Sequence, residues 1–273
     1  MPVSKVKSIA ILLLVLVNAF LLALVVPSHV LQQRQLRQTQ TQLENLFQAQ
    51  GITLDAARLP KTPALQALTV TYTADLTLSA ARALLGDEVL LEEDSAQYLS
   101  RFASSSGSFS IDRSGSFSAA FTGRVSVSDP TADAKKLLGR MSIETNAVTI
   151  ETTGDLTTVT ATQALQQAPV FPAAIKLIYR DGVLTAIEGT LYLGTLTLAD
   201  TRTLMSCSDA LIAFLGSRES LSFQGSTILR AVPCYTRSGT AAAATVRLDP
   251  TWRLETDDGM FLVNGITGAV VRS

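Results

Sequence analysis

The chain has 273 residues, which is enough for one large domain or two small ones once an N-terminal segment is set aside. Its 22 Lys and Arg nearly balance its 23 Asp and Glu, so no basic surface for nucleic acid is expected. Two cysteines and a single histidine, His29, cannot complete a four-ligand structural zinc site without carboxylates, and no metal or cofactor is expected.

The N-terminal region contains an apolar run of 18 residues over 9–26. A bilayer core is spanned by about 20 apolar residues in a helix, so the run suffices to cross a membrane. Lys5 and Lys7 precede it, which favours a cytoplasmic N-terminus. The sequence therefore predicts a cytoplasmic tail over 1–8, a single transmembrane helix over 9–26, and a cell-membrane protein with most of its chain outside the cytoplasm.

Two features of this segment leave alternatives open. A cleaved signal peptide would have a shorter apolar region, typically about 7–15 residues, and Pro27 stands at the best cleavage site, so an uncleaved anchor is favoured. Asn18 is the single polar residue of the run. It forms a hydrogen bond either within its own helix or with a partner transmembrane helix, where such a bond contributes about 0.6–2 kcal/mol.

Residues 27–60 are predicted to form a juxtamembrane helix followed by a connector. Glycine is absent from 28–50, and the helix is expected to end at Gly51. The heptad pattern is too short to indicate a coiled coil, so a spacer is favoured. The helix carries a thin apolar stripe of Leu31, Leu36, Leu43, Leu46 and Phe47.

Three short helices are expected in the remainder, over 77–85, 130–138 and 206–215. The second follows a capping Asp129 with proline at its first position, and the third opens on a capping-box serine. All three end on a large apolar residue, a leucine and a glycine, which suggests repeated units of a helix followed by strands. Their spacing is too uneven for a solenoid.

Strand patterns follow each helix and are joined by turn signals. Asp181-Gly182 and Asp258-Gly259 are strong hairpin signals. Alternating polar and apolar residues predict an antiparallel sheet with one face in water and helices on the other. The expected fold class is α+β over 61–273, as one domain or as two subdomains dividing near residue 200.

The two ends of the chain resemble a known family. The stretch 4–9, running into an apolar helix that contains Asn18, is similar to the start of YycI proteins. The closing segment 252–270, with Asp258-Gly259 between two strands, resembles the last hairpin of YycI and of PepSY-type modules. The family's usual N-terminal tryptophan is absent, and Val3 stands near its place.

This resemblance implies a regulatory function. YycI and its relative YycH are non-enzymatic, single-pass membrane proteins that restrain a sensor histidine kinase of the WalK/YycG type. They do so through membrane-helix and ectodomain contacts. The expected partners are therefore the membrane and a sensor histidine kinase, with or without a second single-pass regulator, and Asn18 is the expected contact in the membrane. The alternatives are a PepSY-like envelope inhibitor or ligand-binding module, and a structural envelope protein.

No catalytic arrangement is evident, because His29 lies beside the predicted membrane segment and no other histidine can act as a base. No small-molecule substrate is expected. Cys207 and Cys234 are either free buried thiols or a disulfide closing a loop of about 28 residues, which would contribute roughly 3 kcal/mol. Trp252, the single tryptophan, is predicted to lie in the core.

Overall fold

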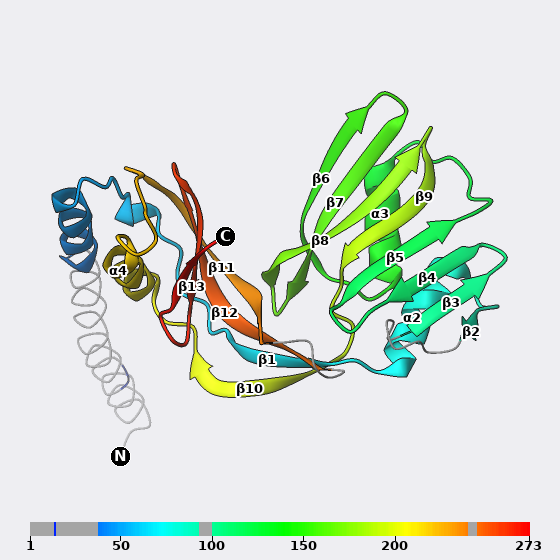
Figure 1. Cartoon of the computed structure of the whole chain (residues 1–273), viewed down its shortest axis with the longest axis horizontal. Helices are drawn as coiled ribbons and strands as arrows, with labels where there is room; N and C mark the ends of the chain where they lie inside the picture. The colour runs from blue at the N-terminus through cyan, green and yellow to red at the C-terminus, as the bar shows by residue number, and fades with distance from the viewer. Residues whose placement is uncertain (1–13, 15–37, 93–99, 240–244) are drawn as a thin grey trace, which may run out of the picture.

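The computed structural model describes residues 14, 38–92, 100–239 and 245–273 (Figure 1). The predicted cytoplasmic tail, the predicted transmembrane helix apart from Leu14, and Asn18 and His29 lie outside these ranges. Among the described residues, no helix combines the length and the apolar character needed to cross a membrane.

Three units with the same order of elements, one helix followed by four strands, make up most of the fold. Unit 1 comprises α2 (Ala74–Leu85), β2 (Leu90–Glu92), β3 (Ser100–Ser104), β4 (Gly107–Ile111) and β5 (Ser116–Phe121). Unit 2 comprises α3 (Pro130–Arg140), β6 (Thr145–Thr153), β7 (Leu156–Leu165), β8 (Ala168–Arg180) and β9 (Val183–Thr190). Unit 3 comprises α4 (Cys207–Ser217), β11 (Ile228–Ser238), β12 (Thr245–Thr256), β13 (Gly259–Asn264) and β14 (Val270–Arg272). The predicted repeat of helix and strands is confirmed by this order.

The three helices bury equivalent positions when they are aligned on their shared endings. Residues at i and i+3 lie on the same face of a helix, so one apolar stripe per helix faces the sheet. The predicted caps of the second and third helices are also present: Asp129 accepts a hydrogen bond from the backbone N–H of Ala132, and Ser206 accepts one from Asp209. The aligned buried pairs are Ala81 and Leu84, Ala134 and Leu137, and Leu211 and Phe214.

Units 1 and 2 form an eight-stranded antiparallel part of the sheet. Within each unit the strands follow one another as a meander, and the last strands, β5 and β9, pair edge to edge with Ser118 opposite Glu188. Helices α2 and α3 contact each other and lie behind this part of the sheet in Figure 1. The opposite face is polar, and the hydroxyls of Ser110 and Ser118 form a hydrogen bond there at 3.0 Å. The expected α+β fold with helices on one face is confirmed here.

Unit 3 and two linking strands, β1 (Gln66–Thr71) and β10 (Thr195–Thr203), form the six-stranded part. Strand β12 is central: β11 pairs along one side, while β1 and then β13 pair along the other. The two parts join where β11 runs parallel to β8, with Tyr235 opposite Val170. The described strands thereby form one 14-stranded sheet. The predicted division near residue 200 falls within β10, whose partner β1 lies far earlier in the chain.

The N-terminal helix over residues 38–49 contributes to the core. Residues 38–49 are helical, the helix lies beside α4 in Figure 1, and Gly51 follows it at a φ of 75°, as the predicted helix end requires. Its Leu43 and Phe47 are buried, with 4% and 0% of their surface exposed. Glu44 accepts a hydrogen bond from the backbone of Ala56 at 2.9 Å. Over its described residues, this helix therefore packs against the rest of the fold, whereas the sequence favoured a spacer.

Candidate functional site

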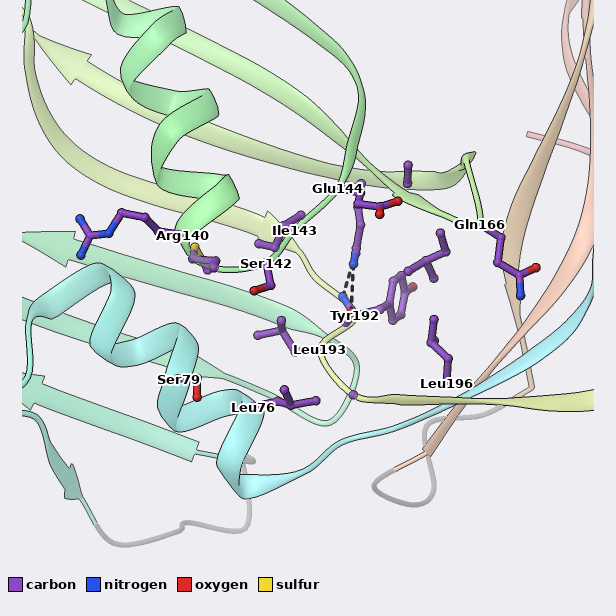
Figure 2. A pocket seen from close by; sticks show the side chains of 15 residues that line it. Leu76, Ser79, Arg140, Ser142, Ile143, Glu144, Gln166, Tyr192, Leu193 and Leu196 are labelled. Carbon is purple, nitrogen blue, oxygen red and sulfur yellow. Dashed lines mark hydrogen bonds between the residues drawn. The ribbon is translucent and has the colours of Figure 1, made fainter.

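A hollow of about 330 Å³ lies between units 1 and 2 and the segment that leads from β9 into β10 (Figure 2). Its walls come from four places: Leu76 on α2, the segment after α3 that includes Glu144, the β7–β8 turn with Gln166, and the link from β9 to β10 with Tyr192. Residues far apart in the sequence therefore share one concave site. Concave sites with apolar walls and a few convergent polar groups are typical places for ligand or partner binding.

The apolar side of the hollow is partly exposed. Leu76 is 42% exposed and Leu196 is 40% exposed, and Figure 2 shows them across from Glu144 and Gln166. Leu198, two residues along the same face of β10, is 60% exposed. Large apolar side chains gathered at a concavity mark a binding surface more often than isolated ones do. We call Leu76, Leu196 and Leu198 the leucine rim.

The floor of the hollow is held by a buried glutamine. The side chain of Gln163 is 3% exposed, donates to the backbone oxygen of Tyr192 at 3.0 Å, and accepts from its backbone N–H at 2.9 Å (Figure 2). The backbone N–H of Ala164 donates to the carbonyl of Glu144 at 2.8 Å. The polar groups of the floor are thus paired internally and position the walls.

The turn at the upper edge is conformationally strained. Gln166 and Gln167 both have positive φ, at 49° and 65°, and connect the paired residues Leu165 and Ala168. A two-residue hairpin of this type favours Asn-Gly because left-handed backbone is unfavourable for residues with a longer side chain. The hydroxyl of Tyr235 donates to the side-chain oxygen of Gln166 at 2.9 Å, which ties the turn to β11.

A second set of contacts fixes the two parts of the sheet beside the hollow. Arg237 on β11 donates to the backbone oxygen of Ser114 in the β4–β5 turn at 3.3 Å. Burial raises the pKa of the Tyr72 and Tyr192 phenols, and the positive charge of Arg237 opposes that shift in both. Both phenols are therefore neutral at neutral pH, and Arg237 contributes the positive charge near them.

The lining of the hollow contains two charged side chains, Arg140 and Glu144. Glu144 is the one carboxylate among its lining residues, so the lining offers no carboxylate pair for acid–base catalysis. Across the described ranges, no group of three or more His, Cys, Asp or Glu side chains is placed to hold a metal ion. The lining therefore combines apolar side chains with neutral polar groups, one carboxylate and one guanidinium.

The residues singled out from the sequence lie elsewhere. Asn18 is outside the described residues. Cys207, at the start of α4, and Cys234, on β11, are free thiols, so the structure gives no support to the disulfide that the sequence left open. Burial raises the pKa of each thiol to about 12. Trp252 is fully buried and donates to the backbone oxygen of Met205 at 2.9 Å, which confirms its predicted core position.

Sequence reasoning missed the hollow because its residues come from separate units. A weak signal was present: Leu196 and Leu198 alternate with threonines in a strand, and Leu76 lies outside the buried stripe of its helix. Nothing in the order of residues states that these three positions converge. Their convergence depends on the pairing of β10 with β1, which are separated by units 1 and 2.

Comparisons with known proteins gave a small number of distant structural similarities. No family model and no curated protein matches the sequence. The chain is similar to an uncharacterized protein from Eubacterium rectale ATCC 33656 at 10% identity, over 77% of this chain and 86% of that one, with a TM-score of 0.48. It is also similar to the Bacillus megaterium YpeB C-terminal domain at 11% identity, over 74% and 98% respectively, with a TM-score of 0.36.

Proposed function

We propose that this protein is a membrane-anchored, extracytoplasmic regulator of a two-component sensor histidine kinase, and that it acts by protein contact through the leucine rim. The resemblance of its two ends to YycI proteins supports the kinase as partner. The 18-residue apolar run after Lys5 and Lys7 supports the membrane anchor and the topology.

The observation that carries this proposal is the leucine rim itself. Leu76 and Leu196 come from elements on either side of the sheet junction, and Leu198 extends the surface along β10. Fully burying a leucine side chain contributes about 1.5–3 kcal/mol relative to leaving it exposed. These half-exposed residues together therefore offer a few kcal/mol to a partner, which is the scale of a small binding hot spot.

The ectodomain contact is tested by a matched pair of variants on β10. Leu198→Glu places a charge on the rim, whereas Thr197→Glu places the same charge on the other face of the same strand, where the residue is also exposed. Co-purification of the full chain with a tagged kinase from membranes is expected to fall about tenfold or more for the first variant and to stay unchanged for the second.

Three results would count against the proposal. Equal co-purification of both variants would place the contact away from the rim. Failure of the wild-type chain to co-purify with any sensor kinase of its own cell would remove the kinase as partner. A reporter fused after Ser273 that is active in the cytoplasm would contradict the proposed topology.

The membrane helix is proposed as a second contact through Asn18. Helix pairing in lipid relies on packing and on hydrogen bonds between helices, so Asn18→Leu is expected to weaken kinase association by up to about 2 kcal/mol. Insertion should become easier, because an amide is removed from the apolar run. Unchanged association with normal insertion would leave the ectodomain as the place of contact.

A PepSY-like inhibitor or ligand-binding module is the second candidate, and the hollow favours it. Its volume of about 330 Å³ lies at the lower end of the range for small-molecule sites, which is about 300–1,000 Å³. An envelope protease captured by the wild-type chain and lost in Leu198→Glu would favour this candidate over the kinase.

A further inference from the structure

Strand β6 (Thr145–Thr153) forms one outer edge of the eight-stranded part. It pairs with β7 on one side and with no other described strand. Seven of its nine residues are exposed, and an edge of this length presents a row of unpaired backbone groups. Thr153 pairs with Leu156 across a two-residue turn. The alternation of antiparallel pairing then directs the backbone groups of Val148, Ile150 and Thr152 outward.

The apolar face of the sheet is incompletely covered at this edge. Ile150 is opposite Val159 on β7, and both lie on the face that the helices cover. Val159 is fully buried, whereas Ile150 is 54% exposed. Val148, one pair farther along, is half-buried against the same core. A neighbouring strand with apolar residues at matching positions would complete this layer.

Strand β6 also lacks the features by which the other outer strands resist pairing. Strands β2 and β14 are three residues long, and Arg272 lies within the second of them. Strand β10 carries an ion pair of 2.7 Å between Asp200 and Arg202. Strand β6 contains no proline, lysine or arginine, and Glu151 is its single charged residue. Short strands, inserted charges and proline are the usual protection of an edge.

The strand is complementary to itself in the antiparallel direction. When two copies are paired about Thr149, Val148 of each copy lies opposite Ile150 of the other. The interface therefore contains two Val148–Ile150 pairs, in which the exposed apolar side chains cover one another. Glu151 then faces Ala147 of the other copy, and no like charges are opposed, which would otherwise disfavour pairing. The order of pairs follows from the sequence of β6.

The molecule already contains one junction of this kind. Strands β5 and β9 join unit 1 to unit 2 edge to edge and antiparallel, with Ala119 opposite Ile187. Two units of the same element order are therefore joined by strand pairing along that line, and their helices lie on the same face and contact each other. A second copy meeting β6 would repeat this arrangement at the other side of unit 2.

We propose that β6 is a homodimerisation edge, at which two copies of this chain pair antiparallel about Thr149 and continue the sheet from one molecule into the other. The interface is isologous, because the same strand serves both copies. This inference does not depend on the kinase or on the leucine rim.

Disulfide trapping of the full-length protein in membranes tests the register. In an antiparallel pair without mutual hydrogen bonds, facing Cα atoms lie about 4.5 Å apart, within the range that a disulfide spans. Thr149→Cys is therefore expected to give a covalent dimer on mild oxidation. Ser118→Cys, exposed in the middle of the same sheet, should remain monomeric. The native thiols are buried and give little background.

A disruptive variant tests the same edge without a crosslink. Ile150→Lys places a charge opposite Val148 of the other copy, at a site exposed enough to accept it in the monomer. The purified full-length protein in detergent is expected to have the mass of a dimer, and the variant at least tenfold weaker self-association. Circular dichroism and Trp252 fluorescence should match the wild type. A wild-type mass of one chain at tens of micromolar, or equal trapping at Thr149→Cys and Ser118→Cys, would overturn the proposal.

Discussion

The side-chain amide of Gln163 pairs with the backbone of Tyr192 through two hydrogen bonds, of 3.0 and 2.9 Å, in the way that one strand residue pairs with another. Gln163 ends the regular part of β7, and Tyr192 lies in the link from β9 to β10. A single buried side chain thereby substitutes for a missing strand at the floor of the hollow.

Replacing this glutamine should be costly. Gln163→Ala would leave the buried N–H and carbonyl of Tyr192 without partners, and each lost partner costs about 1–3 kcal/mol, so we expect about 2–4 kcal/mol of destabilisation. Urea unfolding followed by Trp252 fluorescence measures it. Lys176→Ala, an exposed change on the open face of the sheet, should stay within about 0.5 kcal/mol. Similar values for both variants would contradict this account of the floor.

Gly115 is required at the tip of the β4–β5 turn for two separable reasons. Its φ is 84°, and an added Cβ would lie 2.6 Å from the Tyr72 hydroxyl and 2.8 Å from the Leu191 carbonyl. Gly154 also has a positive φ, of 63°, but has open space around it. Gly154→Ala should therefore cost about 1 kcal/mol from backbone strain, and Gly115→Ala about 1–3 kcal/mol more from crowding. Equal losses in thermal unfolding would show that the crowding is relieved.

The strained β7–β8 turn offers a stabilising change. Gln167→Gly relieves left-handed strain of about 1–2 kcal/mol, against an entropy loss of about 0.4–1 kcal/mol, so a net gain of up to about 1 kcal/mol is expected. Gln224→Gly is the matched control, since Gln224 is exposed and has no positive φ, and it should destabilise. A loss of stability in Gln167→Gly would mean that the glutamine side chain contributes more than its backbone strain removes.

The thiols of Cys207 and Cys234 should be unreactive in the folded protein. Burial raises the pKa of Cys207 and Cys234 to about 12, so neither is a thiolate at pH 8. A chromogenic thiol reagent is expected to find no reactive group in the native chain and both thiols in denaturant without reductant. Detection of no thiol in denaturant would establish the disulfide that the sequence left open.

Alkaline pH should loosen the junction through Tyr235. Burial raises the pKa of this phenol to about 12, above its ordinary value near 10, so the folded state favours the neutral form. Its contribution to stability is fully present below about pH 10 and is lost as the pH rises from there through about 12. Tyr235→Phe should show a smaller fall in unfolding free energy over this interval, together with a lower stability at neutral pH from the lost hydrogen bonds to Gln66 and Gln166.

Local features of the fold were readable from the sequence, and long-range ones were not. Caps and turn pairs are decided within a few residues, so Asp129, Ser206 and Asp258-Gly259 led to correct elements. The predicted ends at Gly139 and Gly216 were wrong, because α3 and α4 continue through these glycines to Arg140 and Ser217. The first helix begins at Ala74, one turn earlier than predicted, and the hydroxyl of Thr77 bonds back to the Thr73 carbonyl within it. The Gln166-Gln167 turn was not predicted, because glutamine is not typical of two-residue hairpin turns. The hollow and the docking of Phe47 depend on contacts between distant segments.

The pairing of Thr71 with Thr195 has a modular consequence. At this point β1 departs toward unit 1 and β10 returns from unit 2, so everything between them enters and leaves through adjacent residues. In topological terms, units 1 and 2 are a cassette inserted into the loop of a β1–β10 hairpin, and unit 3 with that hairpin is the host. Replacing residues 72–194 with an Asn-Gly turn would leave the host's β10–β1–β12 pairing formally intact. Gene fusion or excision at this site could therefore vary the cassette while the host and its N-terminal helix are retained.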